Sequence, residues 1–118
     1  MTQKTLFILN DAPYGSERTY NGLRLAGAIA KRADQQVKIF LMGDAASCAK
    51  ANQKVPQGFY SVELMLRAPA RHGVEIGVCG TCMDARGIAE TELMQDAHRG
   101  TLEQLADWSI WADQTLVF

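Results

Sequence analysis

The stretch VCGTCMDARG contains the residues best suited to chemistry, two cysteines separated by two residues. A thiolate is the species that attacks sulfur. Backbone N–H groups of a helical turn beginning near Thr81, or the charge of Arg86, would lower the pKa of the Cys79 thiol, whereas Asp84 would raise it. Cys82 follows one turn later, within reach to resolve an oxidised or persulfidated Cys79 by forming a disulfide. We therefore predict Cys79 and Cys82 as the catalytic residues, with Asp84 and Arg86 in supporting positions.

Other interpretations of the cysteine pair stay open. Free cysteine is among the most buried residue types, so both side chains can simply fill space. A C-x-x-C pair near a strand–helix–strand pattern is also typical of thioredoxin-type oxidoreductases, although Gly87 interrupts the long helix that should follow. A structural zinc site needs four ligands, and His72 and His98 are not spaced as a second ligand pair, so we expect no metal. We expect Cys48 to pack rather than to react.

The segment NDAPYGSE is a second candidate region, because it joins a predicted strand to a predicted helix. Helix-terminal N–H groups at Gly15, Ser16 and Glu17 can hold an anion, which for a sulfur protein is a persulfide or a sulfite group. Tyr14 either hydrogen-bonds a ligand or covers the crevice, and Asn10 stands where the strand ends. The spacing matches neither glycine-rich nucleotide loop, so we expect no cofactor. A capped helix with a tight turn explains the same residues without a ligand.

The elements that must position these residues alternate between strands and helices. Continuous apolar runs predict strands at 5–10, 37–42, 74–78 and 115–118. Helices are predicted over 17–33 and 45–51, and others begin at 61 and 101. This alternation predicts an α/β three-layer sandwich with a mainly parallel sheet. Ligand crevices in such sheets lie beyond the carboxyl ends of the strands, so segments 10–16, 43–44 and 79–87 are expected to face one crevice.

Several local features refine this outline in the first two-thirds of the chain. Ser16 is a good N-cap for the first helix, and Gly22 and Gly27 let the backbone of that helix approach the sheet closely. Ser61 is placed to cap the third helix. Pro69 lies too deep in this helix for a straight course and should kink or end it.

The last third of the chain contains weaker signals. A short strand is expected near 93–95. The last helix opens at Thr101 with a capping-box pattern and is expected to bury Leu102. Trp108 and Trp111 cannot easily both face the sheet, so we expect at least one of them at a subunit interface or at the rim of the core.

Composition limits the functions that the chain can have. With 118 residues and no internal repeat, residues 1–118 are expected to form one domain. The net charge of −1 leaves no basic field for nucleic acid or an anionic membrane surface. No apolar run approaches the roughly 18 residues that span a bilayer. Three cysteines do not make a disulfide framework, so we expect a cytoplasmic protein with reduced thiols.

Taken together, these motifs resemble the DsrE/DsrF-like sulfur-relay family, and within it the small YchN-type members. The resemblance covers nearly the whole chain. Its motifs are APYGSE, NGLRLAGAIA, IFLMGDA, GFY, the pattern C-x-T-C-x-D-x-R-G-I and the closing TLEQLADWSIWADQTLVF. The resemblance implies a five-stranded, mostly parallel sheet and a homotrimer or homohexamer. Pro69 departs from the uninterrupted helix that is usual in the family.

The resemblance also implies a function. Relay members carry a persulfide on the cysteine that corresponds to Cys79, and Cys82 corresponds to the second cysteine of the YchN-type members. The expected function is that of a small sulfur carrier or sulfurtransferase, whose partners are a sulfur donor protein and a sulfur acceptor protein. Two alternatives remain: a non-catalytic oligomeric binding module, and a Cys79–Cys82 dithiol/disulfide switch.

Overall fold

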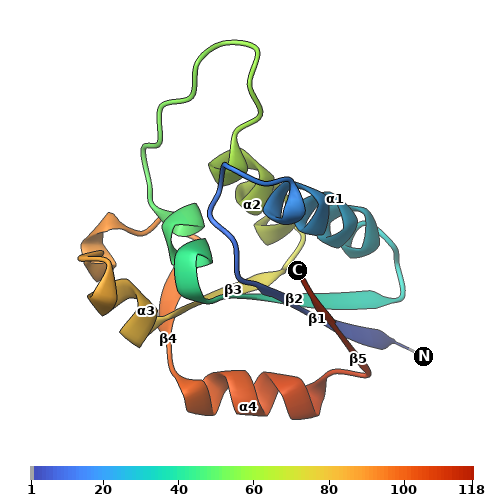
Figure 1. Cartoon of the computed structure of the whole chain (residues 1–118). Coiled ribbons are helices and arrows are strands. Elements are labelled where there is room, and N and C mark those ends of the chain that lie inside the picture. Colours follow the sequence, from blue (N-terminus) through green and yellow to red (C-terminus); the bar gives the residue numbers. More distant parts are fainter. Residues whose placement is uncertain (1) are drawn as a thin grey trace.

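The computed structural model describes residues 2–118 as strands and helices in regular alternation (Figure 1). The strands are β1 (Gln3–Leu9), β2 (Gln35–Leu41), β3 (Glu75–Cys79), β4 (Ala97–Gly100) and β5 (Gln114–Val117). The α-helices are α1 (Arg18–Ala30), α2 (Val62–Ala70), α3 (Gly80–Ala85) and α4 (Leu102–Trp111). Two short 3₁₀ helices, η1 (Gly43–Ala49) and η2 (Glu90–Glu92), complete the order.

All five strands are parallel and lie in the order β4-β3-β2-β1-β5. The central strands β1 and β2 are the apolar runs of the sequence, and Leu6, Phe7, Ile39 and Phe40 have almost no exposed surface. Neighbouring residues on one strand point to opposite faces, so consecutive buried residues require cover on both sides of the sheet. The five-stranded parallel sheet is therefore confirmed.

The two faces of the sheet are covered unequally. Helices α1 and α2 lie on one face, and α4 lies on the other (Figure 1). The first face buries the larger cluster, in which Phe7 and Leu41 pack with Leu23 of α1 and Leu66 of α2. The second face buries a small cluster of Leu6, Phe40, Leu105 and Trp108, against which Cys79 packs. The predicted three-layer sandwich is confirmed, with a thin layer on the α4 side.

The start of α1 corrects one predicted cap. The helix begins at Arg18 with Glu17 as N-cap, so the N-cap lies one residue after the predicted Ser16. The Ser16 hydroxyl accepts from the Arg18 N–H at 3.3 Å and donates to the Asp11 carboxylate at 2.7 Å, where the chain turns at Gly15 with a φ of 117°. The helix also ends earlier than predicted, at Ala30.

Three other local predictions were confirmed and one was wrong. A Cβ on Gly22 would lie 2.9 Å from the Leu9 side chain, so glycine there permits the close approach of α1 to the sheet. The same prediction for Gly27 was wrong, because a Cβ there would have no neighbour within 4 Å. The Ser61 hydroxyl caps α2 by accepting from the Leu64 N–H. Pro69 is the next-to-last residue of α2, where the helix ends.

The last third of the chain differs most from the prediction. The strand expected at 93–95 was wrong, because the strand next to β3 is β4, and Leu93 makes only an isolated bridge with Lys50. Thr101 caps α4 as predicted. Leu102 was predicted to be buried but is 70% exposed, because α4 turns Leu105 and Trp108 toward the sheet instead.

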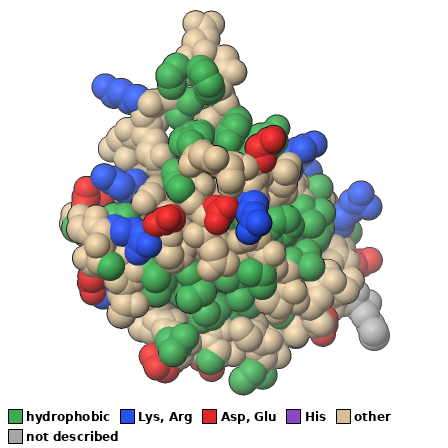
Figure 2. All heavy atoms as spheres, in the orientation of Figure 1, with side chains coloured by type: hydrophobic (Ala, Val, Ile, Leu, Met, Phe, Trp, Pro, Cys, Tyr) green, Lys and Arg blue, Asp and Glu red, His purple; other side chains and the backbone are tan. Residues whose placement is uncertain are grey.

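The remaining surface carries charges of both signs. On the face seen in Figure 2, acidic and basic side chains alternate, and hydrophobic side chains gather below them where charged ones are few. Among residues 2–118, no helix is both long enough and apolar enough to cross a membrane.

Candidate thiol site at the carboxyl edge of the sheet

Cys79 is the residue at which β3 becomes α3. It is the last residue of the strand and the N-cap of the helix, so no loop separates the two elements. Gly80 leaves room for Arg99 at this junction, because a Cβ there would lie 2.7 Å from the Arg99 side chain. The Cys79 side chain is half-buried, so part of it is accessible to solvent.

The surroundings of Cys79 favour its thiolate. Burial alone would raise the pKa of the Cys79 thiol, but hydrogen bonds from the Cys82 and Thr81 side chains and from their backbone N–H groups outweigh burial and lower this pKa below its ordinary value. The Thr81 hydroxyl lies 3.3 Å from the Cys79 sulfur. A half-exposed thiol with a lowered pKa has the properties of a nucleophile.

The pKa of the Cys82 thiol is shifted in the opposite direction, upward. Burial raises the pKa of the Cys82 thiol, and its hydrogen bond with Cys79 raises it further, while the Gly43 N–H and the charge of Arg86 lower it by less. The Gly43 N–H donates to the Cys82 sulfur at 3.2 Å. The pKa values of the two thiols are thus shifted in opposite directions, that of Cys79 toward the thiolate and that of Cys82 toward the neutral thiol.

Arg86 lies beside Cys82. Its Nε and Nη2 groups donate to one oxygen of Asp44 at 3.1 and 2.8 Å, and its Nη1 group donates to the Cys82 carbonyl at 3.1 Å. The Arg86–Asp44 ion pair links the carboxyl end of α3 to η1, and the charge of Arg86 lowers the pKa of Cys82. The predicted influence of Arg86 thus reaches the second cysteine of the pair.

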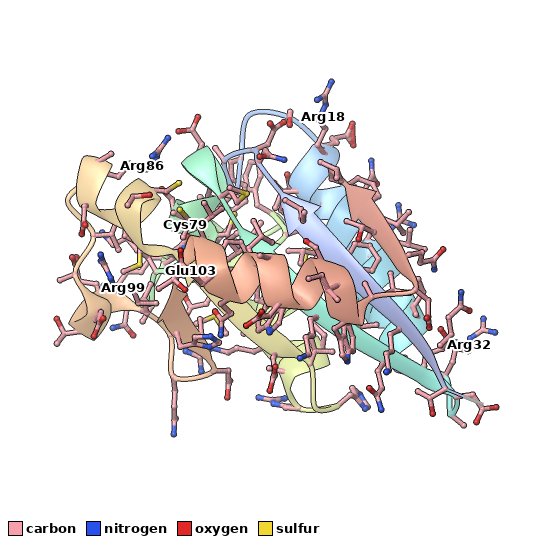
Figure 3. All side chains as sticks on the ribbon, turned by 90° about the horizontal axis from the view of Figure 1, so that it is seen from below. Arg18, Arg32, Cys79, Arg86, Arg99 and Glu103 are labelled. Atoms are coloured by element: carbon pink, nitrogen blue, oxygen red, sulfur yellow. The ribbon has the colours of Figure 1, made fainter. Side chains whose placement is uncertain are left out.

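Arg99 is the site residue that sequence reasoning missed. It comes from β4, where it pairs in register with Val78, and its Nη1 and Nη2 groups donate to the two oxygens of Asp84 at 2.9 Å each. The hydrogen bond with Asp84 raises the pKa of Arg99, and the nearby charges of Glu90 and Cys79 add to this. Figure 3 shows Arg86 and Arg99 at the same end of the molecule as Cys79. No motif marked Arg99, because β4 itself was not predicted.

The expected single crevice forms only in part. Segment 43–44 meets segment 79–87 through the two contacts of Gly43 and Asp44 described above. Asn10 also reaches this edge, since its carbonyl lies 3.4 Å from where a Gly43 Cβ would be, but its side-chain amide donates to the Phe118 carbonyl.

Tyr14 and its neighbours have other contacts. The Tyr14 hydroxyl donates to the Tyr60 carbonyl at 3.0 Å and accepts from the Val62 N–H at 3.1 Å, so it anchors the base of the long loop before α2. Gly15 supplies a turn, and Ser16 contacts Asp11, whose negative charge disfavours an anion at this position.

Cys48 packs, as expected. It lies in η1 with no exposed surface, and burial raises the pKa of its thiol to about 12. Its sulfur lies 3.8 Å from the Asp11 carbonyl.

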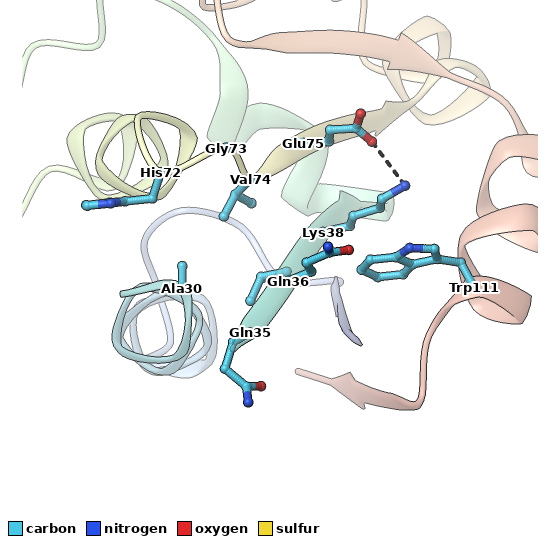
Figure 4. A pocket seen from close by; sticks show the side chains of 10 residues that line it. Ala30, Gln35, Gln36, Lys38, His72, Gly73, Val74, Glu75 and Trp111 are labelled. Carbon is cyan, nitrogen blue, oxygen red and sulfur yellow. Dashed lines mark ion pairs between the residues drawn. The ribbon is translucent and has the colours of Figure 1, made fainter. Parts of the chain in front are cut away.

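A cavity of about 310 Å³ lies at the opposite edge of the sheet, where β2 and β3 begin. Figure 4 shows Trp111 beside Lys38, which is paired with Glu75 at 3.2 Å. This cavity is therefore separate from the thiols. Within residues 2–118, no three His, Cys, Asp or Glu side chains gather as a metal site would require, and no peptide bond is cis.

Comparisons with known proteins agree with this architecture. The model of the DsrE/DsrF-like family matches residues 3–118. The chain is 38% identical to the protein YchN of Escherichia coli K12 over 117 residues, covering 98% of this chain and 99% of that protein. It is 33% identical to an uncharacterized protein of Methanocaldococcus jannaschii over 115 residues, covering 98% of this chain and 99% of that protein.

Solved structures show the same likeness. The crystal structure of YchN from E. coli superposes with a TM-score of 0.93 and covers 99% of this chain and 100% of that one. A protein of unknown function from Methanobacterium thermoautotrophicum superposes with a TM-score of 0.76 at 8% identity and covers 100% of both chains, a likeness of fold alone.

Proposed function

The chain belongs to the DsrE/DsrF-like family, and from this premise we propose that it is a sulfur carrier that holds a persulfide on Cys79 and passes the outer sulfur to a partner protein. The observation that carries the proposal is the position of Cys79, half-buried at the junction of β3 and α3 with the Thr81 hydroxyl 3.3 Å from its sulfur. Hydrogen bonds outweigh burial there and lower the pKa of Cys79, whereas burial raises the pKa of Cys82.

Loading requires one displacement. The Cys79 thiolate attacks the outer sulfur of a donor persulfide, R–S–SH; a new S–S bond forms, the donor S–S bond breaks, and R–S⁻ leaves. The product is Cys79–S–SH, and no electron is gained or lost overall. A lowered thiol pKa favours this step, because more of the attacking thiolate is present at neutral pH.

Unloading has two routes. A thiolate of an acceptor protein attacks the outer sulfur and releases the Cys79 thiolate. Alternatively, Cys82 loses its proton and attacks the inner sulfur, so that the Cys79–Cys82 disulfide forms and HS⁻ leaves. The second route must be followed by reduction of the disulfide by a cellular dithiol, which fits a cytoplasmic location.

Intact-protein mass spectrometry tests the proposal. The protein is incubated with a cysteine desulfurase and cysteine, and its mass is compared with those of the Cys79→Ser and Cys48→Ala variants. We expect an added mass of one sulfur, about 32 Da, on the wild type and on Cys48→Ala but not on Cys79→Ser. An unchanged wild-type mass with a donor that loads another carrier would contradict the proposal.

A dithiol switch is the second candidate, because Cys82 contacts Cys79 directly. For this function the reduction potential of the pair must lie near that of the compartment, which equilibration with glutathione buffers would measure. The third candidate, a binding module without thiol chemistry, is favoured if the Cys79→Ser variant retains full function in cells.

We also propose that the protein is a homotrimer or homohexamer. Its support is a group of large apolar side chains exposed on α4 and β5, with Leu102 70%, Ile110 85% and Val117 63% exposed. Trp108 is buried, and Trp111 lies half-buried with Lys38 over its ring. Light scattering after size-exclusion chromatography measures the subunit number, and a monomer at micromolar concentration would refute this proposal.

A further inference from the structure

Arg99 lies on the edge strand β4, and its side chain contacts α3 at two places. Its side chain leaves β4 and forms a two-pronged contact with Asp84, with both N–O distances at 2.9 Å. Asp84 is the fifth residue of α3, close to its carboxyl end. Such forked arginine–carboxylate contacts fix orientation as well as providing energy. The contact therefore attaches the far end of α3 to β4.

The same guanidinium also contacts the start of α3. A Cβ on Gly80 would lie 2.7 to 2.9 Å from three atoms of the Arg99 guanidinium, so the group lies directly on the Gly80 backbone. Gly80 does not have a positive φ, so glycine is needed here for space and not for backbone conformation. One arginine thus contacts both ends of the helix.

We propose that Arg99 is a positioning residue for Cys79, acting through α3. By holding Gly80 and Asp84 against β4, it keeps the donors of Thr81 and Cys82 directed at the Cys79 sulfur. The helix has only six residues, too few to be stable without outside contacts. The inference deepens the proposed function, since it concerns the same thiol, but it holds for any chemistry in which the Cys79 thiolate reacts.

Several other charged groups lie near the site. They are Asp84 on α3, Arg86 as its C-cap, Asp44 on η1, Glu90 on η2, Glu103 at the start of α4, and His98 and Arg99 on β4. Arg86 is paired with Asp44, and His98 contacts Gln104. The two carboxylates near Arg99, those of Asp84 and Glu90, more than offset its single positive charge, so position rather than net charge is the main contribution of Arg99.

The pH dependence of Cys79 alkylation distinguishes position from charge. If Arg99 acted only as a positive charge, Arg99→Gln would slow alkylation and Asp84→Ala, which removes a negative charge, would speed it. Positioning predicts that both variants slow alkylation at pH 7, by about three- to tenfold, because both detach α3 from β4. The double variant should be no slower than the slower single variant.

Two matched controls sharpen the test. Arg86→Gln removes an arginine whose charge acts on Cys82, so it should change Cys79 alkylation less than Arg99→Gln does. Gly80→Ala pushes the guanidinium away without removing any charge and should slow Cys79, whereas Gly27→Ala, with no neighbour within 4 Å, should not.

Iodoacetamide pulses followed by tandem mass spectrometry resolve Cys79 from Cys82 in one peptide, and circular dichroism checks the fold of each variant. Opposite effects of Arg99→Gln and Asp84→Ala would overturn the inference, as would rate–pH profiles that match the wild type. If Arg99→Gln fails to fold, Asp84→Ala and Gly80→Ala decide the question. No sulfur donor is present, so a failure of persulfide loading would refute the proposed function without affecting this result.

Discussion

Cys48 and Cys79 both lie near the carboxyl end of a strand, yet their surroundings are opposite. Cys48 lies in η1 after β2, has no exposed surface, and has its pKa raised to about 12 by burial. Cys79 ends β3, is half-buried, and has donors that outweigh its burial and lower its pKa. Position at the carboxyl edge is therefore not enough to make a thiol reactive. Reactivity also requires access to solvent and hydrogen bonds to the sulfur that outweigh the effect of burial on its pKa.

The largest expected effect is the difference in reactivity between these two thiols. In the native protein at pH 7, iodoacetamide should modify Cys79 at least about a thousandfold faster than Cys48, which must await opening of the structure. Peptide mass spectrometry after timed pulses measures both rates. Comparable rates would remove the distinction between the two regions.

Replacing Cys48 should destabilise the fold more than replacing Cys79, the reverse of their order in reactivity. Cys48→Ala leaves a small cavity in the core and should lower the free energy of unfolding by about 1–2 kcal/mol. Cys79→Ala, at the rim, should lower it by roughly 0.5 kcal/mol or less. Urea denaturation at neutral pH gives both values, and a larger loss for Cys79→Ala would mean that Cys79 is the structural residue.

The raised pKa of Cys48 predicts a loss of stability at alkaline pH. Above the ordinary thiol pKa of 9.0 the unfolded chain loses the Cys48 proton, while the folded chain keeps it up to about 12. The unfolded state is therefore favoured progressively across this range. At pH 10 the wild type should lose about 1 kcal/mol more than Cys48→Ala does, relative to pH 8. Parallel denaturation curves at both pH values would test this, and equal losses would contradict it.

The smallest expected effect concerns two threonines. The Thr81 hydroxyl lowers the pKa of Cys79, so Thr81→Val should slow Cys79 alkylation at pH 7 by about two- to threefold. The Thr19 hydroxyl likewise lowers the pKa of Cys48, but Thr19→Val should leave Cys48 unreactive, since burial dominates there. An unchanged Cys79 rate in Thr81→Val would assign the lowered pKa to Cys82 and the backbone alone.

Much of this architecture was predictable from the sequence. The apolar runs predicted β1, β2 and β3 to within about two residues at each end, because strands buried on both faces must be apolar throughout. Cys79 was placed correctly at the end of its strand for the same reason. The strand β4, with the sequence AHRG, was missed because it lies at the edge and carries two exposed polar side chains.

The site was predictable only where its residues are close in sequence. Cys82 and the backbone N–H groups near Thr81 lie within one helical turn of Cys79, so their nearness followed from spacing, whereas the side-chain hydrogen bonds of Thr81 and Cys82 to Cys79 were not predicted. Arg99 did not, because its contact with Asp84 depends on the pairing of β3 with an unpredicted strand. Tyr14 was grouped with the thiols because its loop follows β1, but the loop is long enough to leave the edge and contact the base of another loop.

The central claim is that the transferred sulfur resides on Cys79. Its most direct test is tandem mass spectrometry of the wild-type protein after loading by a persulfide donor and capping with an alkylating reagent, which locates the added sulfur on one of three cysteines. We expect the added sulfur on Cys79, a disulfide between Cys79 and Cys82 as a later product, and Cys48 unmodified. Added sulfur found first on Cys82 or on Cys48 would contradict it.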